Sequence, residues 1–141
     1  MKQPEESPGF LLWHLTLRWQ REVAVALKPL GLTHVQFVLL ASTWWLNTHA
    51  QQPNQAVLAA YAGTDVKMTS QVIRTLEQKG LITRDVDAAD TRARRLVVTE
   101  AGTALAPQAI EAVEAVDVAL LKPLSKTAAR AFTEGLRQLR G

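Results

Sequence analysis

The spacing of apolar residues changes abruptly at Gly80, and this change most constrains the fold. Before it, Thr69, Val72, Ile73 and Leu76 recur at i, i+3, i+4 and i+7, the buried stripe of an amphipathic helix. After it, "LITRDV" and "RRLVVT" are rich in β-branched and aliphatic residues, and the polar stretch "DAAD" lies between them. Such segments predict two short strands joined by a polar tip. A helix followed directly by a β-hairpin is therefore expected in the middle of the chain.

Six residues of the N-capping type stand where helical spacing begins. The side chain of such a residue accepts a hydrogen bond from a backbone N–H of the first helical turn. The expected caps are Ser7, Thr33, Asn54, Asp65, Thr99 and Ser125. Breaks are expected where proline or glycine interrupts the spacing, at Pro29, Gly31, Pro53, Gly63 and Gly80. The chain therefore predicts two helices, a short helix, a further helix, a hairpin, a long helix and a last helix.

Apolar residues at helical spacing also predict which faces are buried. In the second helix the expected stripe is Phe37, Leu40, Ala41 and either Trp44 or Trp45. In the last helix the corresponding residues are Ala128, Phe132, Leu136 and Leu139. Both helices are thus expected to pack against other parts of the protein.

The order of these elements predicts a mainly α fold with a small β-hairpin. Two short helices that meet at a glycine-bearing turn are typical of a helix-turn-helix. With the hairpin behind them, residues 33–99 fit the winged helix-turn-helix arrangement. A length of 141 residues is suited to a single domain over residues 1–141.

Composition excludes several classes of protein. The chain has no cysteine, so disulfides, thiolate metal sites and cysteine-based redox sensing are excluded. Its net charge of +3 leans mildly toward a polyanionic partner. Because no signal-peptide pattern and no apolar run of membrane-spanning length is found, we expect a cytoplasmic protein without a membrane partner.

Catalytic and metal-binding motifs are also missing from the sequence. His14, His34 and His49 stand on three separate segments and lack the spacing of a metal site. There is no nucleophile elbow, phosphate-binding loop or recognisable carboxylate pair. We therefore predict that the protein is not an enzyme and uses neither a metal nor another cofactor.

The helix from Val66 to Lys79 is the first candidate functional element. Its buried stripe leaves a polar face formed by Lys67, Ser70, Gln71, Arg74 and Gln78. On a recognition helix in the major groove, Gln71 can pair with adenine and Ser70 can contact a base or a phosphate. Met68 and Thr69, at the leading end, are suited to apolar contact with a thymine methyl group. The alternative is an ordinary amphipathic helix with a solvated polar face.

Three stretches of the sequence resemble the MarR (multiple antibiotic resistance regulator) family of transcription factors. They are "LTHVQFVLL", "LEQKGLITR" and "DAADTRARRLVVTEAG", and the last fits the family's wing pattern at Asp90, Arg92, Leu96, Val98, Thr99 and Gly102. The resemblance implies a homodimer that binds a pseudo-palindromic operator in double-stranded DNA. It also implies that residues 8–30 and 100–141 form the dimerisation helices, and that a small molecule in a nearby cleft weakens DNA binding.

The resemblance separates the charged residues of the wing into different roles. Arg92 is at the family's patterned position and is expected to enter a minor groove, where the potential is most negative. Arg94 and Arg95 lie in the outgoing strand on opposite faces, so that one, assigned here to Arg94, can reach a phosphate. Asp90 is expected to orient an arginine by a charge-assisted hydrogen bond. Arg84, Lys67 and Arg74 are further candidates for phosphate contacts. For any single arginine, a solvated charge is the alternative.

Tryptophans on the first two helices raise the possibility of an effector pocket. Flat apolar walls suit a phenolic or other aromatic molecule. The residues assigned to a possible pocket are Trp13, Trp44 and Trp45, while Trp19 lies on the same helices. Tryptophan at helical spacing more often belongs to a core or to a dimer interface, and this alternative stays open.

Together these features predict a dimeric DNA-binding transcriptional regulator, with a repressor favoured over an activator. We expect it to bind a pseudo-palindromic operator and to respond to a small effector, for which an aromatic molecule is the candidate class. The alternative from a different class is a winged-helix module that binds another protein and does not bind DNA. The two differ in whether the protein shows salt-dependent binding to its own upstream DNA.

Overall fold

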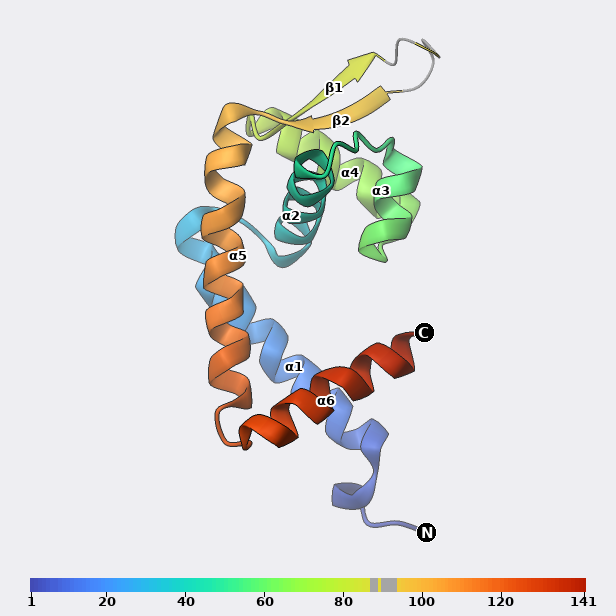
Figure 1. Cartoon of the computed structure of the whole chain (residues 1–141), viewed down its shortest axis with the longest axis vertical. Coiled ribbons are helices and arrows are strands. Elements are labelled where there is room, and N and C mark those ends of the chain that lie inside the picture. The colour runs from blue at the N-terminus through green and yellow to red at the C-terminus, as the bar shows by residue number, and fades with distance from the viewer. Residues whose placement is uncertain (87–88, 90–93) are drawn as a thin grey trace.

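The computed structural model, which describes residues 1–86, 89 and 94–141, has six α-helices and a two-stranded sheet in the predicted order (Figure 1). The elements are α1 (Pro8–Leu27), α2 (His34–Thr48), α3 (Gln55–Ala62), α4 (Val66–Gln78), β1 (Ile82–Val86), β2 (Arg94–Val98), α5 (Glu100–Leu121) and α6 (Lys126–Arg140). Two short 3₁₀ turns, η1 (Pro4–Glu6) and η2 (Lys28–Leu30), stand before and after α1. The mainly α fold with a hairpin wing is confirmed.

All six predicted N-caps are confirmed by side-chain hydrogen bonds. Each of them accepts from a backbone N–H in the first turn of its helix. Thr33 and Gln36 form a reciprocal capping box at the start of α2. Gly31, Gly63 and Gly80 adopt positive φ at the ends of η2, α3 and α4. These local signals fix the element boundaries because caps and left-handed residues satisfy backbone groups that a helix leaves unpaired.

The hydrophobic core lies beneath the hairpin and is shared by five helices and both strands. Its fully buried members include Leu27 of α1, Leu58 of α3, Ile73 of α4, Leu96 of β2 and Ala106 of α5. In Figure 1, α2 runs through the middle of this group. The C-terminal half of α1 and the N-terminal half of α5 are therefore built into the same core as the helix-turn-helix.

The predicted buried stripe of α2 is only partly right. The helix buries Leu39, Leu40, Thr43 and Leu46. Of the predicted residues, Leu40 is buried, Phe37, Ala41 and Trp44 are half-buried, and Trp45 is exposed. The reason is that α2 packs against α1, α3, α4, α5 and β2, so its contacts surround it instead of following one stripe. Buried Thr43 is accommodated because its hydroxyl donates to the carbonyl of Leu39 at 2.7 Å.

The hairpin and α5 meet at a tightly bonded junction. The Thr99 backbone N–H donates to the Leu81 carbonyl at 3.0 Å, and its hydroxyl donates to the Gly80 carbonyl at 2.6 Å. The Gly102 N–H donates to the same hydroxyl at 3.0 Å. A Cβ atom on Gly102 would lie 2.2 Å from the Leu81 carbonyl oxygen, so only glycine fits. The threonine and glycine of "TEAG" thus hold the wing against the long helix.

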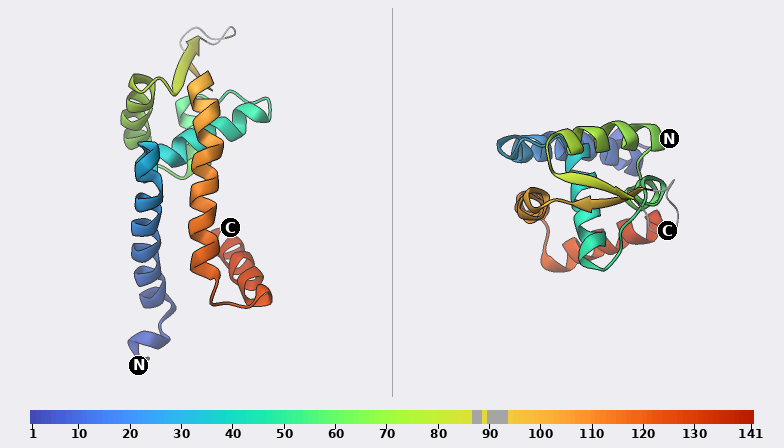
Figure 2. Two further views of the ribbon diagram at one scale, coloured as in Figure 1. Left: turned by 90° about the vertical axis from the view of Figure 1, so that its left-hand side faces the viewer. Right: turned by 90° about the horizontal axis from the view of Figure 1, so that it is seen from above.

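The molecule has two ends of different character. The hairpin, α2, α3 and α4 form one end, and α1 and α5 lead from it side by side to the other, where the N-terminus and α6 lie (Figures 1 and 2). No residue of α6, all of which the structure describes, is buried. We call these parts the winged-helix end and the helical end.

Candidate nucleic-acid interface

Helix α4 begins at a doubly bonded N-cap. The Asp65 carboxylate accepts from the backbone N–H of Lys67 at 3.3 Å and of Met68 at 2.9 Å. The hydroxyl of Thr69 donates to the Asp65 carbonyl at 2.7 Å and lies 2.6 Å from the Thr64 hydroxyl. The Thr69 side chain is fully buried, so it is not available for the thymine contact predicted for it, and that prediction is corrected here. The same bonds fix the turn between α3 and α4.

The opposite face of α4 is polar and open to solvent. Lys67, Gln71, Arg74 and Gln78 are exposed and Ser70 is half-buried. Met68, in the first turn, is 38% exposed. Among the described residues, neither Lys67 nor Arg74 forms an ion pair, so the two positive charges face outward. The helix therefore presents amide, hydroxyl and cationic groups on one face, the chemistry that base edges and phosphates accept.

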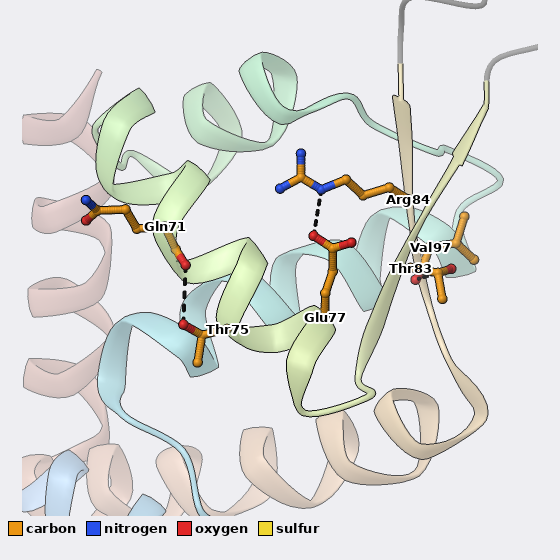
Figure 3. A network of polar contacts seen from close by, with 6 residues as sticks. All are labelled: Gln71, Thr75, Glu77, Thr83, Arg84 and Val97. Atoms are coloured by element: carbon orange, nitrogen blue, oxygen red, sulfur yellow. Dashed lines mark hydrogen bonds and ion pairs between the residues drawn. The ribbon is translucent and has the colours of Figure 1, made fainter.

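A half-buried ion pair connects the hairpin to α4 (Figure 3). The Arg84 Nε of β1 donates to the Glu77 Oε1 at 2.7 Å, and the two side chains are 27% and 33% exposed. Across the hairpin, the Thr83 hydroxyl donates to the Val97 carbonyl at 3.4 Å. Figure 3 also shows the Gln71 side-chain amide pointing away from the hairpin. Arg84, predicted as a phosphate contact, is thus held in place by Glu77.

The described part of the wing places its two strand arginines differently. The antiparallel register sets Val86 opposite Arg94 and Asp85 opposite Arg95. Arg94 is exposed, whereas Arg95 is half-buried and makes an interaction of its own. Neighbouring residues of a strand point to opposite faces, so the two arginines lie on opposite faces of β2, as predicted. Asp90 and Arg92, assigned to the wing tip, lie outside the described residues.

Asn47 is a positioning residue that the sequence did not reveal. Its Nδ2 donates to the Leu96 carbonyl at 3.2 Å and to the Gln51 carbonyl at 3.0 Å, and its Oδ1 accepts from the Val98 N–H at 2.9 Å. The Leu96 N–H donates to the Pro53 carbonyl at 2.8 Å. The outer edge of β2 is therefore bonded to α2 and to the loop after it. Asn47 fixes the position of the wing on the helix-turn-helix.

Lys79, directly after α4, makes a second connection that the sequence did not predict. Its Nζ donates to the Gly31 carbonyl at 2.6 Å and to the Gln36 Oε1 at 2.8 Å. The end of α4 is thereby attached to the turn that joins α1 to α2. This side chain links the end of α4 to the start of α2, although Lys79 and Gly31 are 48 positions apart in the sequence.

The tryptophans assigned to a possible pocket do not gather around the cavity at the helical end. A cavity of about 430 Å³ lies between α1, α5 and α6, and the tryptophan that lines it is Trp19. Trp13 is 62% exposed on α1, and Trp44 packs against the core. Trp45 is half exposed and packs against the imidazole of His49 with the two rings tilted and their centroids 4.2 Å apart. The pocket assignment of these three residues is therefore not supported at this cavity.

Trp19, Asp117 and His34 connect three helices beside the cavity. The Trp19 Nε1 donates to the Asp117 Oδ1 at 2.8 Å, joining α1 to α5. The rings of Trp19 and His34 make an edge-to-face contact, with their centroids 5.0 Å apart. This contact joins α1 to the first residue of α2. Burial lowers the pKa of His34 below 6.5, and the Asp117 carboxylate opposes this by raising it. At neutral pH the imidazole is therefore uncharged.

Metal-binding clusters and membrane-spanning helices are the remaining features to consider in the described residues. These residues contain no group of three or more histidines, cysteines, aspartates or glutamates that could hold a metal ion. No single helix among them is long and apolar enough to cross a membrane. Among these residues, only Pro8–Leu30 and α2 taken together have the length and apolar composition of a membrane span, and the two are bent by 72° relative to each other.

The arrangement of α4 and the hairpin defines a class of protein. A polar recognition helix beside a hairpin wing, built on one core, is a winged helix-turn-helix DNA-binding fold. Residues 32–93 match the model of the MarR family. An uncharacterized HTH-type transcriptional regulator of Bacillus subtilis (strain 168), YdcH, is 42% identical over 96% of this chain and 91% of its own length. The chain belongs to the MarR family, and it is a transcriptional regulator of the winged helix-turn-helix class.

Other relatives extend the comparison. The HTH-type transcriptional repressor Rv2887 of Mycobacterium tuberculosis is 32% identical over 96% of this chain and 95% of its own length. A crystal structure of Rv2887 in complex with DNA has a TM-score of 0.76, with 30% identity over 96% and 98% of the two chains. Rv2887 was also crystallised with salicylic acid. CouR from Rhodococcus jostii RHA1, bound to p-coumaroyl-CoA, has a TM-score of 0.85 at 25% identity, covering 99% of this chain and 95% of that chain.

Proposed function

We propose that the protein is a homodimeric repressor that binds a pseudo-palindromic operator and is controlled by a small molecule, without catalysis of its own. The observation that carries this proposal is the exposed polar face of α4, set beside the hairpin by Glu77 and Arg84. The Rv2887 structure with DNA supports it, because that relative covers nearly the whole of this chain.

In the proposed complex, α4 of each protomer lies in a major groove. Gln71 reads a base, and Met68 contacts a thymine methyl group, since both are exposed near the start of the helix. Ser70, half-buried beside them, contacts a base or a phosphate. Among the described residues, those proposed to contact phosphates are Lys67, Arg74, Arg84 and Arg94. Arg92, oriented by Asp90, is proposed from the sequence to enter the adjacent minor groove.

The dimer is proposed to form through the helical end, with residues 33–99 left to bind DNA. Four consecutive apolar residues of α1, Phe10 to Trp13, are exposed, and so are Leu136 and Leu139 of α6. Exposed apolar surface of this extent is typical of a protein–protein interface. A second copy of the chain would cover both helices at once by two-fold symmetry.

The proposed response to a small molecule is supported by the cavity between α1, α5 and α6. Its volume of about 430 Å³ is within the usual range for small-molecule sites. Leu12 and Leu136, which line it, also lie in the proposed dimer interface, so a molecule bound there would contact both protomers. Trp19, which lines it, also contacts the first residue of α2 through its ring. A bound molecule would therefore touch the helices that lead to the helix-turn-helix.

The DNA-binding part of the proposal is tested by comparing two exposed arginines. Fluorescence anisotropy would follow binding to a duplex from the region upstream of the protein's own gene, over a range of salt concentrations. Arg74→Ala on α4 should reduce the slope of log affinity against log salt by about one per protomer. Arg21→Ala on α1, also exposed, is the matched control and should leave the slope unchanged.

Two results would contradict this proposal. If Arg74→Ala and Arg21→Ala had the same slope as the parent, α4 would not be the DNA-contacting helix. If the parent protein showed no salt-dependent binding to any duplex, the winged helix would instead serve as a protein-interaction module without DNA binding.

A further inference from the structure

Two polar contacts hold the C-terminal end of α4 from different sides. The Arg84 Nε of the hairpin donates to the Glu77 Oε1 at 2.7 Å. The Lys79 Nζ donates to the Gly31 carbonyl at 2.6 Å and to the Gln36 Oε1 at 2.8 Å. Because Lys79 keeps the right-handed helical conformation, it lies about 200° around the helix axis from Glu77. The hairpin therefore holds α4 on one side, and the turn between α1 and α2 holds it on the other.

The turn that receives Lys79 is itself fixed by local bonds. Gln36 and Thr33 form the capping box of α2, in which the Gln36 Oε1 accepts from the Thr33 N–H at 3.2 Å. Leu32, directly before the cap, is buried in the core. The same Gln36 oxygen accepts from Lys79, so one atom is shared by the start of α2 and the end of α4.

Lys79 lies off the polar face that α4 presents to solvent. It is about 100° around the axis from Gln78, and two of the three donors of its ammonium group are used by Gly31 and Gln36. Apolar contacts with the core are not directional, so hydrogen bonds on both sides of α4 define its rotation about its axis more narrowly. The base that Gln71 faces depends on this rotation.

We propose that Lys79 is a positioning residue for operator recognition, which acts through Gln36 and Gly31 without touching DNA. The proposal rests on the regulator function proposed above and adds a residue outside the set that contacts DNA. Recognition of a sequence needs side chains aligned with base edges, whereas non-specific binding depends on phosphate charge. Lys79 therefore contributes to discrimination between operator and unrelated DNA, and not to general attraction.

The test measures binding to two duplexes of equal length by fluorescence anisotropy, one from the region upstream of the protein's own gene and one unrelated. Lys79→Met removes the ammonium group and keeps an unbranched side chain. We expect its affinity for the upstream duplex to fall by at least about fivefold. Its affinity for the unrelated duplex, and the slope of log affinity against log salt, should stay as in the parent. Lys28→Met, at an exposed position of η2 near the same turn, removes the same charge and should match the parent.

A second substitution attributes the effect to the shared oxygen. Gln36→Met removes the acceptor of the Lys79 bond. When it is combined with Lys79→Met, the double variant should bind the upstream duplex within about twofold of Lys79→Met alone, because residues that act as one contact are not additive.

Three results would overturn the proposal. If Lys79→Met bound the upstream duplex like the parent, the contact with the turn would not influence recognition. If it lost affinity for both duplexes alike, Lys79 would act on the fold or on a phosphate, and a phosphate contact would also lower the salt slope by about one per protomer. If Gln36→Met weakened binding further in the double variant, Lys79 would not act through Gln36. A parent protein that did not distinguish the two duplexes would instead contradict the regulator function itself, whatever the variants showed.

Discussion

The two ends of the molecule differ in how far a single protomer buries its apolar side chains and pairs its polar groups. At the winged-helix end, Asn47, Thr99 and the Glu77–Arg84 pair connect helices to the hairpin, and the exposed apolar residues are spread over α2, α3, α4 and β1. At the helical end, α6 has no buried residue and the apolar residues of α1 are exposed in one run. The winged-helix end is thus packed and bonded within one chain, whereas the helical end leaves apolar side chains of α1 and α6 exposed.

The largest expected effect on the winged-helix end comes from Gly102→Ala. The added Cβ would overlap the Leu81 carbonyl oxygen, so the start of α5 must move away from the hairpin. We expect the free energy of unfolding to fall by about 3 kcal/mol, measured by urea denaturation. Ala104→Gly, an exposed position two residues later in the same helix, is the matched control and should cost about 1 kcal/mol. A Gly102→Ala protein as stable as the parent would mean that this junction is not tightly packed.

Asn47→Ala tests whether the wing depends on α2. Removal of the amide leaves the Val98 N–H and the carbonyls of Leu96 and Gln51 without this partner. A loss of about 2 kcal/mol in unfolding free energy is expected, together with weaker operator binding. Gln51→Ala keeps the backbone carbonyl of Gln51 and serves as the control. If Asn47→Ala bound DNA as tightly as the parent, the wing would be positioned by other contacts.

Leu139→Glu tests the helical end. Leu139 is 87% exposed on α6, so the substitution should leave the protomer folded but place a charge in the proposed interface. Sedimentation equilibrium should show a dimer dissociation constant raised by at least about tenfold, since a leucine side chain contributes about 2 kcal/mol when buried. Val57→Glu, 51% exposed on α3, is the control at the winged-helix end and should leave the dimer intact. Equal dimerisation of both variants would remove α6 from the interface.

Ala50→Gly should stabilise the loop that supports the wing. Ala50 has a φ of +59°, a left-handed conformation in which a Cβ is strained and glycine is not. We expect the melting temperature to rise, with a gain of about 1 kcal/mol. Ala60→Gly, exposed within α3, should lower stability by a similar amount because glycine is unfavourable inside a helix. A decrease for both variants would indicate that the strain at Ala50 is negligible.

The smallest expected effect is a pH dependence from His34, at the boundary between the two ends. Because its pKa is lowered in the folded state, the unfolded chain binds more protons as the pH falls below 6.5. The contribution of His34 to stability is therefore present above 6.5 and lost as the pH falls through the folded pKa. His34→Gln should unfold with a weaker dependence on pH between neutrality and that region. An unchanged pH profile would show that the imidazole does not become more exposed on unfolding.

Much of the fold could be predicted because its signals are local. An N-cap bonds to the first turn of its own helix, and a glycine at a turn is identified by its own φ. The six N-caps, the turns after α3 and α4, and the change to strands at Gly80 could therefore be predicted. The outward face of α4 followed from a periodicity of 3.6 residues in the same way. The resemblance to the MarR family added the expected order of parts, and the comparisons confirmed the family.

The contacts that could not be predicted join residues far apart in the sequence. Asn47 meets β2 and Lys79 meets Gly31 only after the chain has folded, and neither residue type signals its partner. Thr69 belonged both to the predicted buried stripe of α4 and to the end of the helix predicted to contact bases. The structure buries it, so the first of these two predictions is the correct one. Trp19 was not assigned to a pocket because the sequence gives no indication that Asp117 would face it from α5.

The most direct test of the central claim is a stoichiometric titration of the parent protein with a duplex from its own upstream region, followed by fluorescence anisotropy. If the winged-helix end reads DNA and the helical end pairs two protomers, binding should saturate at two protomers per duplex. Affinity should then fall steeply between about 50 and 200 mM salt. Saturation at one protomer per duplex would contradict the proposed dimer. Affinity that did not change with salt, or that matched an unrelated duplex of the same length, would contradict operator recognition by α4 and the wing.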